Sequence, residues 1–297
     1  MFQSPDNPAI EQQTRLLLRR AGAKGEFPTP VDEIVAAAGL TVPEQSMFSD
    51  SVIEQAPEYL RRAIRKLTGP VQALLDRKVQ EVHIDPSITN QGRTAFLKLH
   101  EATHQILPWQ RDLAFADDAA TLSPTTRALQ EQEANLGASN LLFQHEAFDD
   151  VSHQYKTGMA SVLDLAQLVG ASAHATFRRY VRVHDGIAAG VVLDLSPCSR
   201  DPLGYNRHEM DVSHKWSKQF GSSYWPTVLR APPYSFVSVA EQARASSGAV
   251  RTDFVYPTLQ NEPVTLNAEV YSNQHRLFVL IWKPRRELLR RGRIIAA

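Results

Sequence analysis

The residues best suited to chemistry lie in one short pattern, His100-Glu101-Ala102-Thr103-His104. On an α-helix, side chains four positions apart lie on the same face, so the two imidazoles could bind one metal ion. Imidazole and carboxylate groups are the ligands that zinc uses in tetrahedral sites. Glu101 lies beside the first histidine and could accept a proton from a water molecule at the metal. The pattern therefore predicts a zinc site with a general base.

The sequence around this pattern favours a partly buried helix, which we expect over residues 93–107, before Pro108. A glutamate at position 101 would be costly to bury in such a helix without a partner, and a water molecule at the metal would supply one. The alternative is that the two histidines only decorate a helix surface. The flanking apolar residues are Phe96, Leu97, Leu99, Ile106 and Leu107.

A catalytic zinc ion usually has three protein ligands and an open position, so a third ligand must come from elsewhere in the chain. A second helix is expected over residues 125–143, and its Glu131 shares a face with Asn135 and Ala138. Small residues at 134 and 138 would let the two helices approach closely. We expect Glu131 to be the third ligand, with Glu133 as the fallback. Either glutamate could instead be an ordinary exposed carboxylate.

The two segments FLKLHEATHQIL and EQEANLGASNLLF together resemble the ImmA/IrrE metallo-endopeptidases. The resemblance extends over residues 8–183 and includes the stretches TPVDEIVAAAGLTV and LAQLVGASAHATFRRYVRV. The chain departs from the family pattern at several positions. Gly137 replaces a usual Phe, Phe143 and Gln144 replace a common Met-Pro, and Ala102 and Thr103 replace a frequent Leu-Gly.

The resemblance implies a zinc-dependent endopeptidase whose substrate is typically a helix-turn-helix transcriptional repressor, cleaved after a stress or mobile-element signal. In this chain His100, His104 and Glu131 would hold Zn²⁺, and Glu101 would act as general base and then as general acid. Asn135 would orient a metal ligand by hydrogen bonding to it. An oxyanion-stabilising His or Tyr is usual in such chemistry, and ordinary packing is the alternative role for each candidate. The candidates are His145, His153 and Tyr155.

The expected fold class is α+β, with a mainly helical, zincin-like metallopeptidase domain at residues 1–183 followed by a mixed, β-rich domain at 184–297. Residues 57–79 are expected to be helical, with a break at Gly69-Pro70, and residues 79–85 to form a strand. Strands are also expected within 186–195 and 264–282, where Val, Leu, Ile and aromatic residues gather. By analogy with the IrrE branch, the second domain would be a GAF-like sensor or interaction domain.

Composition excludes several classes of protein. The 32 basic and 32 acidic residues cancel, so a strong overall positive field for nucleic acid is absent. With Cys198 as the one cysteine, neither an internal disulfide nor a cysteine-built zinc site can form. No secretory signal is visible, and the longest apolar run, Gly186 to Leu193, is too short to span a bilayer. We expect a cytoplasmic protein that acts on a protein partner and not on a membrane.

Two other functions stay open. A helix-turn-helix-like pair is expected at residues 162–183, and its arginines at 178, 179 and 182 could contact DNA, although packing within the protein is favoured. The basic run from Lys283 to Arg293 is expected to be a solvated helix face more than a nucleic-acid contact. The protein could also be a non-catalytic regulator with a structural or vestigial metal site.

Overall fold

A computed structural model describes residues 7–49, 72–111, 124–221, 225–256 and 263–284. The chain divides into two compact units by its internal contacts. The first comprises Met1–Val151 with Asp164–Thr176, and the second comprises Ser152–Leu163 with Phe177–Ala297. Helices α9 (Met159–Val169) and α10 (Ala173–Val183) therefore each contribute residues to both units. The domain boundary expected after Val183 stays a prediction.

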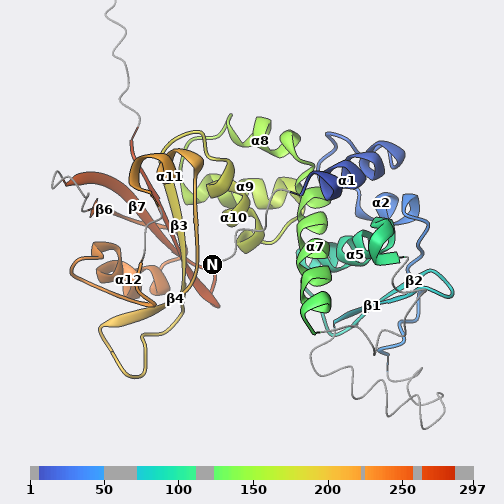
Figure 1. Cartoon of the computed structure of the whole chain (residues 1–297). Helices are drawn as coiled ribbons and strands as arrows, with labels where there is room; N and C mark the ends of the chain where they lie inside the picture. The colour runs from blue at the N-terminus through green and yellow to red at the C-terminus, as the bar shows by residue number, and fades with distance from the viewer. Residues whose placement is uncertain (1–6, 50–71, 112–123, 222–224, 257–262, 285–297) are drawn as a thin grey trace, which may run out of the picture. The chain divides into compact units, whose positions relative to one another are not determined.

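The first unit is mainly helical, and the two predicted site helices are both present (Figure 1). Helix α5 is capped by the Asn90 side chain, which accepts a hydrogen bond from the Arg93 N–H, and it ends before Leu107 and Pro108. The described elements of this unit are α1 (Pro8–Arg20), α2 (Val31–Ala37), β1 (Ala73–Asp76), β2 (Glu81–Ile84), α5 (Gln91–Ile106), α7 (Pro124–Phe143) and α8 (Glu146–Ser152), whose last residue belongs to the second unit.

The helix expected over residues 57–79 is wrong where the structure describes this stretch, because β1 and a turn occupy residues 73–80. Strand β1 pairs antiparallel with β2, from Ala73 opposite Ile84 to Asp76 opposite Glu81. A short apolar run such as ALL does not distinguish a strand from a helix by its periodicity, and here the pairing with β2 decides. The strand expected at 79–85 is confirmed as β2. Residues 57–71 lie outside the described residues.

Helices α5 and α7 cross, and the residues of α7 at the crossing are small. Ala134 and Ala138 are fully buried, as their size predicted. At Gly137 there is no room for a side chain, because a Cβ atom built on it would lie 2.3 Å from Cγ2 of Thr103 on α5. Thr103 cannot easily move away, since it is fully buried and its hydroxyl donates to the Leu99 carbonyl. A glycine at 137 therefore permits this crossing.

The C-terminal end of α7 is held by side chains that replace the usual Met-Pro. Gln144 and His145 both have positive φ, 51° and 55°. The Gln144 side chain accepts a hydrogen bond from the Gly25 N–H at 2.6 Å and donates to the Glu26 carbonyl at 2.7 Å. Thr29 donates to the Leu142 carbonyl. These bonds fix the end of α7 to the segment between α1 and α2.

The second unit contains a curled antiparallel sheet of six strands in the order β5-β4-β3-β8-β7-β6. Its strands confirm those expected at 186–195 and 264–282, and the chain is therefore mixed α+β. The GAF-like assignment stays a prediction. The elements are β3 (Ala188–Asp194), β4 (Gly204–Val212), α11 (His214–Phe220), β5 (Val228–Arg230), the 3₁₀ turn Ser235–Val239, α12 (Ala240–Ala245), β6 (Val250–Tyr256), β7 (Val264–Ser272) and β8 (Arg276–Trp282). Among the described residues, no helix is both long and apolar enough to cross a membrane.

The crossing of α5 and α7 can be tested by giving residue 137 a side chain. We expect Gly137→Ala to lower the free energy of unfolding by about 1–3 kcal/mol through overpacking against Thr103, although alanine favours helices. Chemical denaturation measures this change. The exposed Gln132→Ala on the same helix is the control and should leave stability nearly unchanged. Adding Thr103→Ala should recover stability in the Gly137→Ala protein, and additive losses would contradict the proposed clash.

Candidate metal centre

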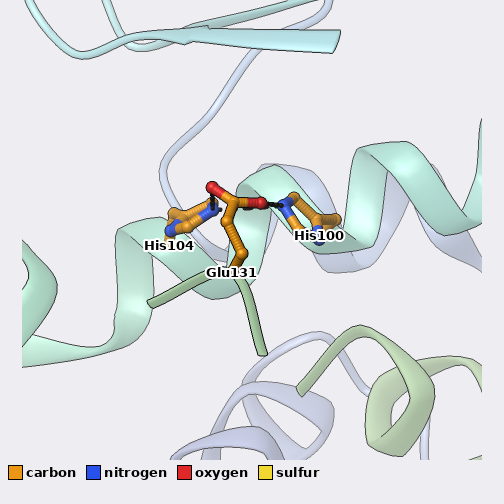
Figure 2. A group of neighbouring side chains, drawn as sticks. All are labelled: His100, His104 and Glu131. Carbon is orange, nitrogen blue, oxygen red and sulfur yellow. Dashed lines mark hydrogen bonds and ion pairs between the residues drawn. The ribbon is translucent and has the colours of Figure 1, made fainter. Parts of the chain in front are cut away.

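Two histidines of α5 and one glutamate of α7 meet at the crossing of these helices (Figure 2). The Nε2 atoms of His100 and His104 lie 3.1 Å apart. The Glu131 carboxylate oxygens lie 3.2 Å from the first Nε2 and 3.7 Å from the second. Among the described residues, these three form the group that could hold a metal ion.

Each imidazole forms a hydrogen bond to a side-chain amide through Nδ1, the ring nitrogen that faces away from the other histidine. Nδ1 of His104 lies 2.6 Å from Oε1 of Gln110, and Nδ1 of His100 lies 3.1 Å from Oδ1 of Asn135. An amide oxygen only accepts hydrogen bonds, so each Nδ1 carries a proton and donates it. In a neutral imidazole the other nitrogen, Nε2, then carries a lone pair. Two such lone pairs at 3.1 Å need a positive charge between them.

The separations fit a zinc ion. Two nitrogens at the usual zinc–nitrogen distance in tetrahedral geometry lie about 3.3 Å apart, and a carboxylate oxygen adds similar edges. The observed separations lie close to these lengths: 3.1 Å between the two Nε2 atoms, 3.2 Å from Nε2 of His100 to Oε2 of Glu131, and 3.7 Å from Nε2 of His104 to Oε1 of Glu131. The site also has a solvent face, since 55% of the Glu131 side chain is exposed. Three protein groups and one open side match the arrangement that catalytic zinc requires.

The charges around the site shift the pKa values of its own members. Burial lowers the pKa of His100, but the hydrogen bond to Glu131 and the charges of Glu101 and Glu131 more than offset this, so its pKa is raised. Burial and the charge on His100 lower the pKa of His104. The hydrogen bond from His100 lowers the pKa of Glu131. In the absence of a metal ion, these shifts favour a proton on His100, and a divalent cation would bring positive charge to the same place.

Glu101 is buried beside the two histidines, with 8% of the residue exposed. Burial raises the pKa of its carboxyl group to about 7, against the opposing charge of His100. The nearby charges are those of His100, Glu131 and Arg77. A carboxyl group whose pKa lies near neutrality is suited both to accept a proton and to return it.

The structure places Glu133 away from the histidine nitrogens. Its Oε2 atom accepts hydrogen bonds from Nε1 of Trp109 at 2.8 Å and from Nε2 of Gln110 at 2.6 Å. It does not belong to the group formed by His100, His104 and Glu131. Glu133 is therefore connected to His104 through Gln110, whose amide bonds to the carboxylate on one side and to the imidazole on the other.

Each of the three oxyanion candidates makes a hydrogen bond within its own unit. In the first unit, His145 is buried and its Nε2 lies 3.0 Å from the Thr14 hydroxyl on α1. In the second unit, Nε2 of His153 lies 3.1 Å from the Val183 carbonyl, and the backbone N–H of Tyr155 donates to Ser152. The oxyanion role of all three stays a prediction.

Sequence reasoning missed three residues at the site. Trp109 and Gln110 follow the end of α5, where no motif marks them, and Arg77 lies in the turn after β1. Nη2 of Arg77 lies 3.4 Å from the His104 carbonyl, and burial lowers the pKa of its guanidinium. The sequence gives little indication of these three residues, because they lie outside the regular periodic pattern of a helix or strand and belong to no known motif.

The arginines of the helix-turn-helix-like pair are engaged within the second unit. Arg178 lies 3.1 Å from Glu209 and 2.9 Å from Asp211, both on β4. Arg182 lies 2.7 Å from Asp211. Contact with DNA through these two side chains would require breaking the ion pairs. The basic run expected at residues 283–293 lies outside the described residues from position 285 onward.

Comparisons with known proteins agree with the site. Residues 64–180 match the family model of Peptidase M78, described as the IrrE N-terminal-like domain. Over this segment the chain is similar to the ImmA/IrrE family, as the sequence motifs predicted. The matched residues include both site histidines, Glu101 and Glu131. Peptidase activity is what a match to this family model indicates.

A solved structure of a Mycobacterium tuberculosis transcriptional regulator has a similar fold. The match has a TM-score of 0.51 and 12% sequence identity, and it covers 94% of this chain and 77% of that chain. At this identity the likeness concerns the fold alone. Among curated proteins no match is found.

Removing the carboxylate of α7 should abolish tight zinc binding. We expect Glu131→Ala to raise the zinc dissociation constant by more than the ~100-fold upper range for outer hydrogen-bond partners, because a ligand itself is lost. Competition with a coloured chelator measures this constant, and Gln132→Ala on the neighbouring position is the control. If the Glu131→Ala protein binds zinc as tightly as wild type, Glu131 is not a zinc ligand.

Zinc affinity should also depend on pH in a defined direction. The pKa of His100 lies above its ordinary value of 6.5, so the proton competes with zinc at and below neutrality. We therefore expect the apparent affinity to fall as the pH drops through this pKa, and proton release on zinc addition. Calorimetry in buffers of different ionisation enthalpy measures the protons released. Affinity that does not change between mildly alkaline and mildly acidic solution would contradict the assignment.

Proposed function

We propose that this protein is a zinc-dependent endopeptidase of the ImmA/IrrE type, with His100, His104 and Glu131 as zinc ligands and Glu101 as general base. The observation that carries the proposal is the pair of inward-facing Nε2 atoms, held at 3.1 Å by amides behind each ring. A bound zinc ion would supply a Lewis acid that polarises a peptide carbonyl and favours ionisation of water.

The residues of the chain divide the remaining tasks. Gln110 and Asn135 hold the two imidazoles so that each Nε2 faces the proposed metal position. Glu131 supplies a negative charge that would offset part of the charge of the zinc ion. Glu101, buried and with a pKa near neutrality, accepts a proton from the attacking water. It then delivers this proton to the leaving amine, so that the general base of the first step becomes the general acid of the second.

The substrate proposed is a protein, and within that class a helix-turn-helix transcriptional repressor cleaved in response to stress. The support is the match of residues 64–180 to the model of the IrrE N-terminal-like domain. The curled sheet of the second unit is proposed to be a GAF-like sensor or interaction domain, and the cytoplasmic location stays a prediction. The most direct substrate test incubates the protein with repressors encoded next to its own gene, with zinc and then with chelator.

Two other functions have weaker support. A structural metal site, as in a non-catalytic regulator, would be closed by four protein ligands, whereas the described residues supply three and Glu131 is half exposed. A DNA-binding function would use arginines that already pair with Glu209 and Asp211. Salt-dependent retardation of duplex DNA tests this function, and absence of binding at low salt removes it.

The role of Glu101 separates catalysis from metal binding. We expect Glu101→Gln to retain zinc at near one ion per chain and to lose peptide cleavage, because an amide cannot accept the proton. Metal analysis and a cleavage assay on the same preparation measure the two properties. Glu33→Gln, at an exposed position of α2, removes the same charge and should leave both unchanged. Undiminished cleavage by Glu101→Gln would eliminate Glu101 as the base.

A further inference from the structure

A chain of hydrogen bonds extends from His104 away from the proposed metal. Nδ1 of His104 lies 2.6 Å from Oε1 of Gln110, and Nε2 of Gln110 donates to Oε2 of Glu133 at 2.6 Å. The same glutamate oxygen accepts the indole N–H of Trp109 at 2.8 Å. Gln110 is buried, with 2% of the residue exposed. A buried amide thus connects an imidazole to a carboxylate.

The neighbours of Gln110 fix the orientation of its amide. The nitrogen faces two groups that only accept hydrogen bonds, the Glu133 carboxylate and the Gln130 carbonyl at 3.2 Å. Exchanging the amide oxygen and nitrogen would place an oxygen against both acceptors and remove the hydrogen bond that each accepts from Gln110. The oxygen of Gln110 therefore faces His104, which fixes the proton on Nδ1 and the lone pair on Nε2.

We propose that Gln110 and Glu133 are positioning residues that fix the tautomer of His104 and strengthen its Nε2 atom as a metal donor. This inference rests on the proposed zinc site. An amide that donates to a carboxylate becomes a stronger acceptor at its own oxygen, because hydrogen bonds in a chain polarise one another. The negative charge of Glu133 thereby acts on His104 through Gln110. Ligating histidines are commonly oriented and made more basic in this way.

The two histidines are not supported equally. His100 meets the amide oxygen of Asn135 at 3.1 Å, longer than the 2.6 Å contact of His104 with Gln110. His104 has a carboxylate behind its amide, and that carboxylate is further fixed by Trp109. The hydrogen bonds through Gln110 to Glu133 therefore strengthen Nε2 of His104 as a donor more than the Asn135 contact strengthens Nε2 of His100.

The same bonds also attach residues 108–111 to α7, so a structural role must be separated from the proposed one. Two variants of the full chain do this. Gln110→Ala removes the connection, and Glu133→Gln keeps an acceptor for Trp109 and Gln110 but removes the charge. The matched control is Gln132→Ala, the exposed neighbour of Glu133 on α7.

We expect the zinc dissociation constant to rise about tenfold for Glu133→Gln and up to about 100-fold for Gln110→Ala, with Gln132→Ala unchanged. The second measurement is the imidazole NMR spectrum of protein labelled with ¹⁵N at histidine. Glu133→Gln should move the Nδ1–H resonance of His104 upfield and leave that of His100 in place. A purely structural role would not move this resonance selectively.

Zinc affinity within about twofold of wild type in both variants would contradict the proposed positioning role of Gln110 and Glu133. So would a loss of affinity that only follows a loss of folding stability, with the His104 resonance unchanged. If Gln110→Ala does not fold, Glu133→Gln alone decides. If wild-type protein binds no zinc, the proposed function fails, and the effect of Glu133 on the His104 tautomer is still read in the zinc-free spectrum.

Discussion

The site depends on one electrostatic constraint, the two histidine nitrogens that face each other at 3.1 Å. Amide oxygens behind both rings hold the protons on the far nitrogens, so the near nitrogens present lone pairs. Such an arrangement is repulsive unless a cation lies between the rings. The raised pKa of His100 and the lowered pKa of Glu131 are the directions expected if a proton on His100 supplies part of this charge. A divalent cation would supply a larger positive charge, and the separations among the two Nε2 atoms and the Glu131 carboxylate suit its coordination.

This constraint holds only if two helices stay at a fixed separation. The third member of the site, Glu131, comes from α7, and it reaches the histidines because α7 approaches α5 without a side chain at Gly137. The C-terminal end of α7 is fixed by Gln144, whose side chain forms hydrogen bonds to the segment between α1 and α2. The geometry of the site is thus set by packed helices and not by a loop, which limits how far the three groups can move apart.

The sequence predicted the parts that follow from regular periodicity. The spacing of His100 and His104 placed both rings on one face, and the small residues of the second helix predicted a close crossing. Gln110 and Trp109 were missed because they follow the end of α5, where position along the chain says little about position in space. The helix predicted over β1 was wrong because Ala73–Asp76 pairs with the neighbouring strand β2 across a short turn, and a short apolar run does not distinguish a strand from a helix. The fold of the second unit was predicted as strands, but strand order depends on long-range pairing.

The contact between Thr103 and Gly137 also bears on how this sequence could have diverged from the family pattern. Where that pattern has glycine in the histidine helix and phenylalanine in the other, this chain has threonine and glycine, so bulk has moved from one helix to the other. Neither exchange is neutral alone. Threonine opposite phenylalanine would be overcrowded, and glycine opposite glycine would leave a void, and either state costs stability. The residues at positions 103 and 137 are therefore coupled, and the size of the side chain at either position limits what the other can hold.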